Sequence, residues 1–202
     1  MPASIQDIGC VVMASGLSAR YGRNKLLEPL DGRAVILHTV ESLITAGLKP
    51  LVVTRSAAVA ALMGREGIDC VRHDGPLKSD TMRTGLEALP AHAAGFLFMP
   101  ADQPLVRPAS LCRLAERYLE NPTRAVRLGF GGVAGSPVLF PAACRGALMA
   151  YRGDRGGMDV LRREHIPCDV VPAEYEWELW DIDTPEGLEC VSKIPEAHFR
   201  RL

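Results

Sequence analysis

Short apolar runs alternate with amphipathic stretches through the first part of the chain, and this alternation limits the folds that it can adopt. The apolar runs have the length of buried strands, whereas the stretches between them place apolar residues at helical spacing. Strands that alternate with helices form a mostly parallel sheet with helices on both faces, so we predict a three-layer α/β domain. The expected strands are 8–13, 51–53, 70–71 and 95–99, and the expected helices are 34–46, 57–65, 79–89 and 108–119.

The second part of the chain has a less regular pattern. A final helix is expected to begin at Pro185, with Thr184 as its N-cap. Because the chain shows no linker, repeat or low-complexity tract, we expect one domain over residues 1–202. The other expected elements are strands joined by a glycine turn within 130–140, helices at 142–151 and 158–164, and strands at 170–171 and 179–182.

The first apolar run ends in a glycine-containing loop that carries several cations. Glycine lets backbone N–H groups approach an anion closely, and cationic side chains help to neutralise it. The spacing of Gly16, Gly22 and Lys25 matches neither a P-loop nor a dinucleotide-binding fingerprint, so a long loop would have to wrap any phosphates. The alternative is a solvated basic turn. The residues of this loop that we take as candidates are Ala14, Ser15, Gly16, Ser18, Arg20 and Lys25.

Three aspartates that follow apolar segments are candidate metal ligands. Asp102 comes after an expected strand, at the edge of the sheet where ligands bind in such folds. A carboxylate there suits Mg²⁺ on a triphosphate, and an Asx turn before Pro104 is the alternative. Asp181 and Asp183 alternate on an expected strand, so both point to one face. We predict Asp181 as the second ligand, with Asp183 in support, because Asp183 is equally suited to cap the last helix.

The composition indicates a globular protein, with 48% hydrophobic and 23% charged residues. A net charge of −1 provides no basic surface for nucleic acid or for an anionic membrane. The six cysteines form no CxxC pair, which is typical of reduced thiols in the cytosol. We therefore expect a cytoplasmic protein that binds neither nucleic acid nor membrane. The five histidines show no metal-ligand spacing, and we assign them no role.

Five motifs, in this order, resemble those of the MobA-like nucleotidyltransferases, which include the molybdenum cofactor cytidylyl- and guanylyltransferases. The loop sequence MASGLSARYGRNK (13–25) is similar to the family signature LAAGxSxRxGxxK, with Ser15 where the family usually has alanine or glycine. The resemblance covers nearly the whole chain and implies a Rossmann-like, GT-A-like nucleotidyltransferase fold. The later motifs are MPADQPLV (99–106), GSPVLF (135–140), GDRGGMDVL (153–161) and DIDTPEG (181–187).

The resemblance also implies roles for individual residues. It assigns catalysis to Arg20, Lys25 and Asp102, and Mg²⁺ binding to the three aspartates. For Ser79, Thr81 and Arg83, the alternative roles are a helix cap and a helix surface. For residues 153–157, the alternative is an ordinary turn. The residues implied near the base and phosphates are Ser79, Thr81 and Arg83, and those implied near the acceptor are Gln103, Ser136, Asp154 and Arg155.

The activity that the resemblance implies is transfer of NMP from an NTP to an anionic acceptor, with release of pyrophosphate. The favoured acceptor is the terminal phosphate of molybdopterin, and a molybdoenzyme or its chaperone would receive the product. A phosphate acceptor is ionised near pH 7, since its second pKa is about 6, so the reaction needs no general base. The alternatives are another phosphorylated small molecule, such as a sugar phosphate or an isoprenoid-precursor polyol, and an assembly factor that binds nucleotide without turnover.

The choice of donor follows from two of the motifs. Residues 13–16 are closer to the cytidylyl-type AAG than to the guanylyl-type AGG. The DIDTPE ending carries aspartates where guanylyl enzymes tend to carry asparagines. We therefore expect CTP to be preferred, with GTP next.

Overall fold

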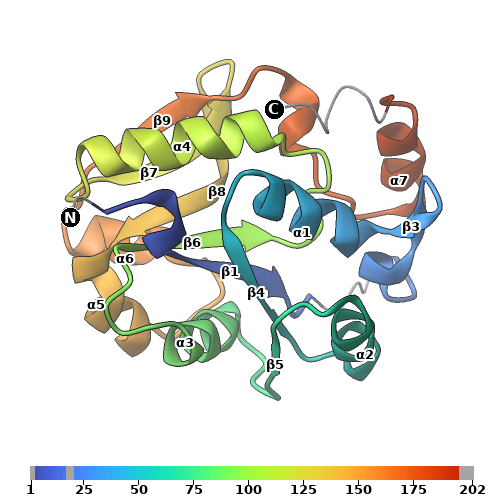
Figure 1. Ribbon diagram of the computed structural model, residues 1–202, viewed down its shortest axis with the longest axis horizontal. Helices are drawn as coiled ribbons and strands as arrows, with labels where there is room; N and C mark the ends of the chain where they lie inside the picture. The colour runs from blue at the N-terminus through green and yellow to red at the C-terminus, as the bar shows by residue number, and fades with distance from the viewer. Residues whose placement is uncertain (1–2, 17–20, 196–202) are drawn as a thin grey trace.

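A mixed sheet of seven strands runs through the molecule (Figure 1). The computed structural model describes residues 3–16 and 21–195. The sheet consists of β1 (Ile8–Ala14), β4 (Lys49–Thr54), β5 (Cys70–Arg72), β6 (Gly95–Pro100), β7 (Ala125–Phe130), β8 (Val133–Pro141) and β9 (Cys168–Pro172), and β2 (Pro29–Leu30) pairs with β3 (Arg33–Ala34) separately. The strand order is β5-β4-β1-β6-β8-β7-β9. β8 is antiparallel to β6 and β7, and the other neighbours in this sheet are parallel.

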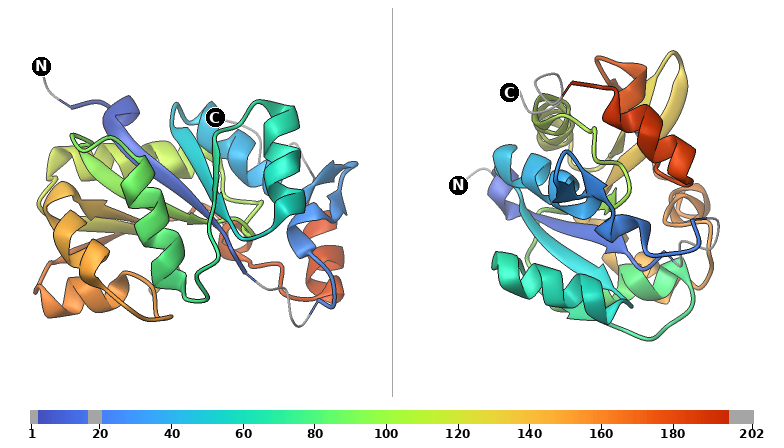
Figure 2. Two further views of the ribbon diagram at one scale, coloured as in Figure 1. Left: turned by 90° about the horizontal axis from the view of Figure 1, so that it is seen from below. Right: turned by 90° about the vertical axis from the view of Figure 1, so that its right-hand side faces the viewer.

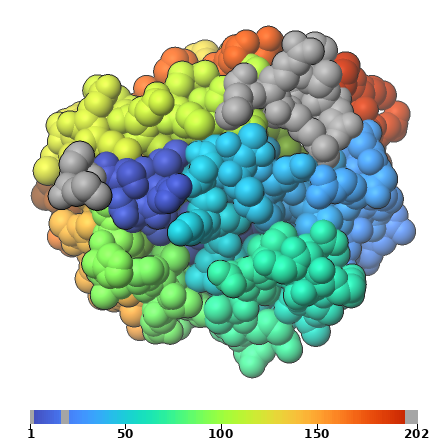
Figure 3. All heavy atoms as spheres, viewed as in Figure 1, coloured from blue at the N-terminus to red at the C-terminus, as the bar shows by residue number. Residues whose placement is uncertain are grey.

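Helices cover both faces of the sheet, as the sequence alternation predicts. They are α1 (Val35–Thr45), α2 (Ala57–Glu66), α3 (Lys78–Ala88), α4 (Pro108–Glu120), α5 (Arg145–Ala150), α6 (Met158–Arg163) and α7 (Pro185–Ser192). Short 3₁₀ turns are η1 (Ile5–Asp7), η2 (Lys25–Leu27), η3 (Ala142–Cys144) and η4 (Glu176–Leu179). Side chains of α1, α2 and α4 pack in one core cluster, and those of α3, α5 and α6 pack in another. Figure 3 shows α4 beside α1 on the first of these faces.

The central strand β1 is buried on both sides. Cys10 and Val12 pack with α1, α2 and α4, whereas Val11 packs against α3 on the opposite face. All three side chains are inaccessible to solvent. This double burial explains why β1 is an unbroken apolar run and not an alternating one.

The C-terminal segment lies beside the loop region after β1 (Figure 2), and a third, smaller core joins the two. Ile182 and Val191 pack there with Leu30 of β2. Helix α7 begins at Pro185, and the Thr184 hydroxyl accepts the Gly187 N–H at 3.1 Å, which confirms the predicted N-cap. This core carries the DIDTPEG motif to the carboxyl ends of β1 and β6.

The strand expected at 179–182 is wrong. η4 ends at Leu179, and the residues that follow have no regular structure up to Thr184. The apolar alternation there has another cause, because Ile182 is fully buried in the third core and its N–H donates to the Asp102 carbonyl at 3.0 Å. The helix expected at 142–151 is also divided, into η3 and α5.

Two expectations from composition can be compared with the structure. All six cysteines are free thiols. In the part of the chain that the structure describes, no helix has the length and hydropathy needed to cross a membrane.

The close contact between α3 and β1 yields a test of the packing. A Cβ atom at Gly85 would lie 2.6 Å from Val11 Cγ2. We expect Gly85→Ala to lower the free energy of unfolding by about 1–3 kcal/mol, because this overlap outweighs the roughly 1 kcal/mol gained in helix propensity. Gly64→Ala in α2 is the matched control, since a Cβ there meets nothing within 4 Å. It should raise the free energy of unfolding by about 0.5–1 kcal/mol in urea denaturation, and a stabilised Gly85→Ala would contradict the packing.

Candidate functional site

A cavity of about 450 Å³ opens at the carboxyl ends of the central strands. One wall comes from the loop after β1 and from α3, and the other comes from β7, β8 and residues 153–157. The predicted residues that line it are Ser15, Gly16, Lys25, Thr81, Asp102, Ser136, Asp154 and Arg155. The predicted residues that lie around it, without forming its wall, are Ala14, Ser79, Arg83, Gln103, Asp181 and Asp183. Ser18 and Arg20 lie outside the described residues.

Lys25 is the centre of the charged part of this cavity. It begins η2, where the Asn24 side chain accepts the Leu26 N–H and fixes the turn. Its Nζ donates to Asp102 Oδ2 at 2.6 Å and to Asp183 Oδ1 at 2.9 Å. Only 7% of the residue is exposed, so these carboxylates balance its charge in place of water.

The two carboxylates determine the charge state of Lys25. Burial alone would lower the pKa of the ammonium, but Asp102 and Asp183 outweigh burial and hold the pKa above its usual value. Lys25 is therefore a permanent positive charge at the ends of β1 and β6.

Asp181 lies beside this pair in a less favourable setting. Its pKa is raised, first by burial and then by the charge of Asp102, with a smaller effect from Asp183, while a hydrogen bond from Gln103 and the charge of Lys25 act in the opposite direction. Three neighbouring acids with one lysine between them favour an additional cation.

The donor set fits a divalent cation that protein and substrate hold together. Asp102 and Asp183 already converge on one cation, the Lys25 ammonium. Within residues 3–16 and 21–195, no group of three or more acidic, histidine or cysteine side chains is arranged to hold a metal by itself. Mg²⁺ typically takes one or two carboxylates and completes its shell with phosphates and water. The residues present meet that demand, and the contacts through Lys25 favour Asp183 as the partner of Asp102.

Neighbouring strands hold the loop after β1 in place. The Thr54 hydroxyl donates to the Ala14 carbonyl at 2.9 Å. The Arg55 guanidinium donates to the Ser15 carbonyl through Nε at 3.1 Å and through Nη2 at 3.0 Å. The backbone that would face a phosphate is therefore anchored from the β4 side.

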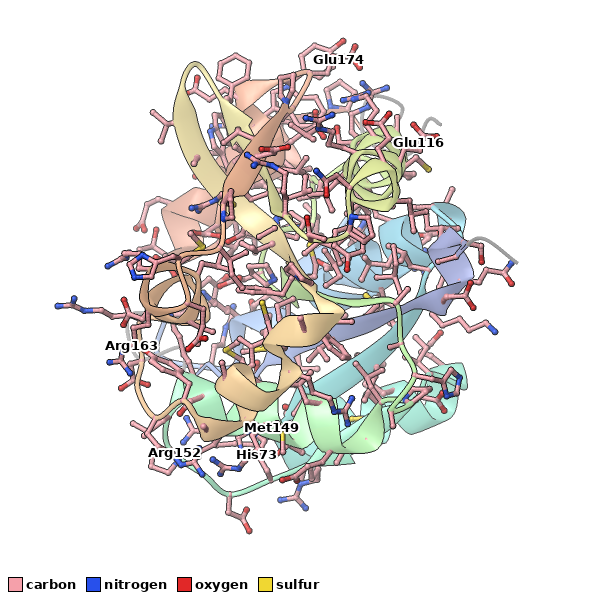
Figure 4. The ribbon with its side chains drawn as sticks, turned by 90° about the vertical axis from the view of Figure 1, so that its left-hand side faces the viewer. His73, Glu116, Met149, Arg152, Arg163 and Glu174 are labelled. Carbon is pink, nitrogen blue, oxygen red and sulfur yellow. The ribbon has the colours of Figure 1, made fainter. Side chains whose placement is uncertain are left out.

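His73 connects this loop to α3, a role that sequence spacing did not indicate. Its Nε2 lies 2.7 Å from the Ser15 hydroxyl and 3.1 Å from the Thr81 hydroxyl. Burial lowers the pKa of His73, and the nearby Arg55 lowers it further, so the ring is neutral at pH 7. Figure 4 shows His73 at the lower edge of the molecule, on the side of α3.

The start of α3 joins the two walls of the cavity. The buried Ser79 hydroxyl accepts the Gly153 N–H at 3.1 Å, and the Ser79 N–H donates to the Gly153 carbonyl at 3.1 Å. Asp154 Oδ1 accepts the Lys78 N–H at 2.9 Å. Arg83 is paired with Asp80 of its own helix at 2.7 Å. Ser79 and Asp154 thus hold the walls together, and their predicted contacts with nucleotide and acceptor stay predictions.

Arg127 of β7 also lines the cavity, although no motif singled it out. The signal present in the sequence was a lone cation within the apolar run of residues 125–130. Such a residue is usually a solvated side chain at the sheet surface, and only the pairing of β7 with β8 brings it to this site.

A match to a known protein family identifies the kind of protein to which this site belongs. Residues 10–168 match the MobA-like NTP transferase domain. The chain belongs to the MobA-like NTP transferase family. Lys25 and Asp102 lie inside the matched region, whereas Asp181 and Asp183 follow it. The family makes the protein a nucleotidyltransferase and confirms the predicted resemblance.

Curated relatives of this MobA-like protein carry different names. The purine catabolism protein PucB of Bacillus subtilis (strain 168) is 25% identical over 200 residues, which is 91% of this chain and 95% of the relative. A probable molybdenum cofactor guanylyltransferase of Thermococcus sibiricus is 28% identical over 117 residues, 56% of this chain and 57% of the relative. A 2-C-methyl-D-erythritol 4-phosphate cytidylyltransferase of Synechococcus sp. (strain WH7803) is 28% identical over 199 residues, which is 93% of this chain and 75% of the relative.

Solved structures confirm the predicted fold. Rv0371c from Mycobacterium tuberculosis H37Rv superposes with a TM-score of 0.81 at 26% identity, covering 93% of this chain and 98% of that one. A manganese complex of the same mycobacterial protein gives a TM-score of 0.77 at 24% identity over 93% and 99%. The MobA-like domain therefore has the same fold as these mycobacterial structures.

The buried lysine predicts a measurable dependence of stability on its charge. In EDTA, Lys25→Met should lower the free energy of unfolding by about 1–3 kcal/mol, because Asp102 and Asp183 lose their shared counter-charge. This is less than for a fully buried pair, since the two aspartate side chains are 25% and 41% exposed. Arg33→Met is the control, because Arg33 and Glu41 form an exposed pair, and should cost less than about 1 kcal/mol. Equal losses in urea denaturation would show that Lys25 is not held as described.

Proposed function

We propose that this protein transfers the NMP of an NTP, with CTP preferred to GTP, to the terminal phosphate of molybdopterin and releases pyrophosphate. The observation that carries the proposal is the Lys25 ammonium held by Asp102 and Asp183 in a cavity at the strand ends. A fixed charge in that place neutralises two anions that must meet, which is the main demand of phosphoryl chemistry. The Thermococcus relative supports molybdopterin as the acceptor.

The strand order gives the cavity two sides. The Ser15 loop and Thr81 of α3 lie towards β4 and β5, whereas Ser136 and Arg155 belong to the wall made by β8, β7 and residues 153–157. Asp102 follows β6, which lies between β1 and β8. In the proposed complex the nucleoside occupies the first side, the acceptor occupies the second, and the α-phosphate lies beside Lys25.

The proposed reaction needs positioned charge and no proton acceptor. An oxygen of the acceptor phosphate forms a bond to the α-phosphorus, while the bond from that phosphorus to the bridging oxygen breaks and pyrophosphate leaves. The acceptor phosphate is largely ionised at neutral pH, since its second pKa is about 6. Lys25 and Arg20 are proposed to neutralise the phosphates, and the backbone held by Arg55 is proposed to orient them.

We assign Mg²⁺ to Asp102 and Asp183, with Asp181 in support. The contacts of both carboxylates with Lys25 support this choice over the sequence-based choice of Asp181 as second ligand. When bound, the ion supplies charge neutralisation and a fixed orientation for the phosphates. Gln103, whose amide donates to the Leu179 carbonyl at 3.3 Å, would then help to keep Asp181 ionised, because it lowers the pKa of that carboxyl.

The lining of the cavity supports an acceptor that carries a planar ring. Its apolar surface includes the thioether and aromatic side chains of Met13, Phe98, Phe140 and Met158. Thioether and aromatic side chains pack well against flat, polarisable rings, and a hydroxylated chain would leave them poorly covered.

A second candidate is cytidylyl transfer to a polyol phosphate, which the Synechococcus relative supports because the match covers 93% of this chain. A cytoplasmic location and delivery to a molybdoenzyme or its chaperone complete the proposal.

Pyrophosphate release tests the proposed function directly. The purified protein is mixed with Mg²⁺, one NTP and molybdopterin, and we expect release with CTP in preference to GTP or ATP. Lys25→Ala should lower turnover at saturating CTP by roughly 100-fold or more, because the neutralising charge is lost from the transition state. Release with 2-C-methyl-D-erythritol 4-phosphate alone would replace molybdopterin by the second candidate, and release with no acceptor from a folded protein would contradict transfer to either.

The metal assignment predicts different losses for the three aspartates. Asp102→Asn and Asp183→Asn should each remove most of the turnover and raise the Mg²⁺ concentration needed for half of the maximal rate. Asp181→Asn should cost less, on the order of the 10–100-fold typical of groups that orient a ligand. The Mg²⁺ dependence of pyrophosphate release measures all three, and a larger defect in Asp181→Asn than in Asp183→Asn would exchange their roles.

A further inference from the structure

Arg127 lies on the face of β7 that borders the cavity. Its neighbours in the strand, Val126 and Leu128, are buried in the core cluster with α4 on the opposite face. Because side chains alternate along a strand, Arg127 points to the other face, where the cavity lies. It is half-buried there.

A local irregularity holds the guanidinium in one place. The pairing of β7 with β8 shifts register between Arg127 and Gly129, so that Arg127 pairs with Val138 and Gly129 with Ala134. The Gly135 carbonyl within this bulge accepts the Arg127 Nε–H at 2.7 Å. Nη1 makes a weak contact of 3.6 Å with the Met158 sulfur. Bulges of this kind often aim a side chain at a site, and here the remaining Nη hydrogens are left for a ligand.

Arg127 has no acidic partner among the described residues, and the same holds for Arg55 and Arg155 of the same cavity. Arg124 is paired with Asp169, and Arg107 is paired with Glu174, which Figure 4 shows at the upper edge, away from His73. The guanidinium of Arg127 has only a carbonyl and a thioether, both neutral. A half-buried charge with neutral partners is costly and is stabilised when an anion binds.

A second polar group on the same wall has no partner in the described chain either. Ser136 lines the cavity and directly follows Gly135, the residue that anchors Arg127. A guanidinium fork and a hydroxyl at one place match the oxygens of a phosphate group.

We propose that Arg127, together with Ser136, binds the phosphate monoester of the acceptor. The inference rests on the proposed function, because it assumes that this wall is the acceptor side. The strand order supports this assignment of the wall that carries Arg127. β7 lies beyond β6 and β8, whereas the loop after β1 and α3 lie towards β4 and β5. Arg127 would therefore contact the acceptor phosphate and leave the NTP to Lys25 and the first loop.

Inorganic phosphate is the probe for this anion site. It is titrated calorimetrically into protein that is saturated with Mg²⁺ and a non-hydrolysable CTP analogue. Arg127→Met keeps the length of the side chain without its charge, and we expect it to weaken phosphate binding about tenfold or more. Its dissociation constant for the CTP analogue should change less than about threefold. Arg127→Lys should bind phosphate with an affinity between those of the unchanged protein and Arg127→Met, because it restores the charge without the guanidinium fork.

Arg124→Met is the matched control, since Arg124 precedes the same strand and is paired with Asp169. It should bind phosphate as the unchanged protein does. The proposal is overturned if Arg127→Met binds phosphate normally, if it loses CTP analogue and phosphate equally, or if the unchanged protein binds no phosphate at millimolar concentration. Should Arg127→Met fail to fold by circular dichroism, Arg127→Lys and Ser136→Ala carry the same comparison.

Turnover separates this inference from the proposed function. If phosphate binding depends on Arg127 but molybdopterin gives no pyrophosphate release, the anion site stands and the acceptor is another phosphate monoester. If molybdopterin turns over and its KM is unchanged in Arg127→Met, the function stands and the role of Arg127 is wrong. The expected result is a KM for the acceptor that rises about tenfold or more, with little change in the KM for CTP.

Discussion

The ion pair network of Lys25 with Asp102 and Asp183 is the interaction on which the site depends. It joins three parts of the chain that are far apart in sequence: the loop after β1, the end of β6 and the segment before α7. A lysine that is 7% exposed requires counter-charges, and both come from segments that the third core also brings in. The Ile182 N–H to the Asp102 carbonyl, at 3.0 Å, completes this junction. The same charges that stabilise the buried amine thus create the place where a metal and phosphates are favoured.

The rest of the cavity is positioned more by hydrogen bonds between helices, strands and loops than by these elements themselves. Ser79 and Asp154 join α3 to residues 153–157, and Arg55 and His73 hold the loop after β1. Ser79, Asp154 and Arg55 bond to backbone atoms, whereas His73 bonds to the Ser15 side chain. Together these hydrogen bonds fix the positions of the two walls. A site for two anionic substrates needs this rigidity, because reaction depends on the distance between them.

Much of the architecture was predictable because the burial of side chains appears in the local sequence as apolar periodicity. The helices and central strands follow from apolar periodicity, and Thr184 with Pro185 marks the start of α7. The same reasoning placed a strand at 179–182, where alternation reflects one buried isoleucine against the third core. Periodicity reports which side chains are buried, but it does not distinguish a strand from an extended segment whose hydrogen bonds lead elsewhere.

The sequence by itself determined the α/β class, the family, and the positions of Lys25 and Asp102 after apolar strands, because these depend on residues that are close in the chain. Only the tertiary structure decided that Lys25 contacts Asp183, that His73 joins Ser15 to Thr81, and that Arg127 faces the cavity without an acidic partner among the described residues. Such contacts depend on which distant segments meet and on a two-residue shift in the register of β7 against β8. No local pattern encodes that choice, since it is made by packing of the whole domain.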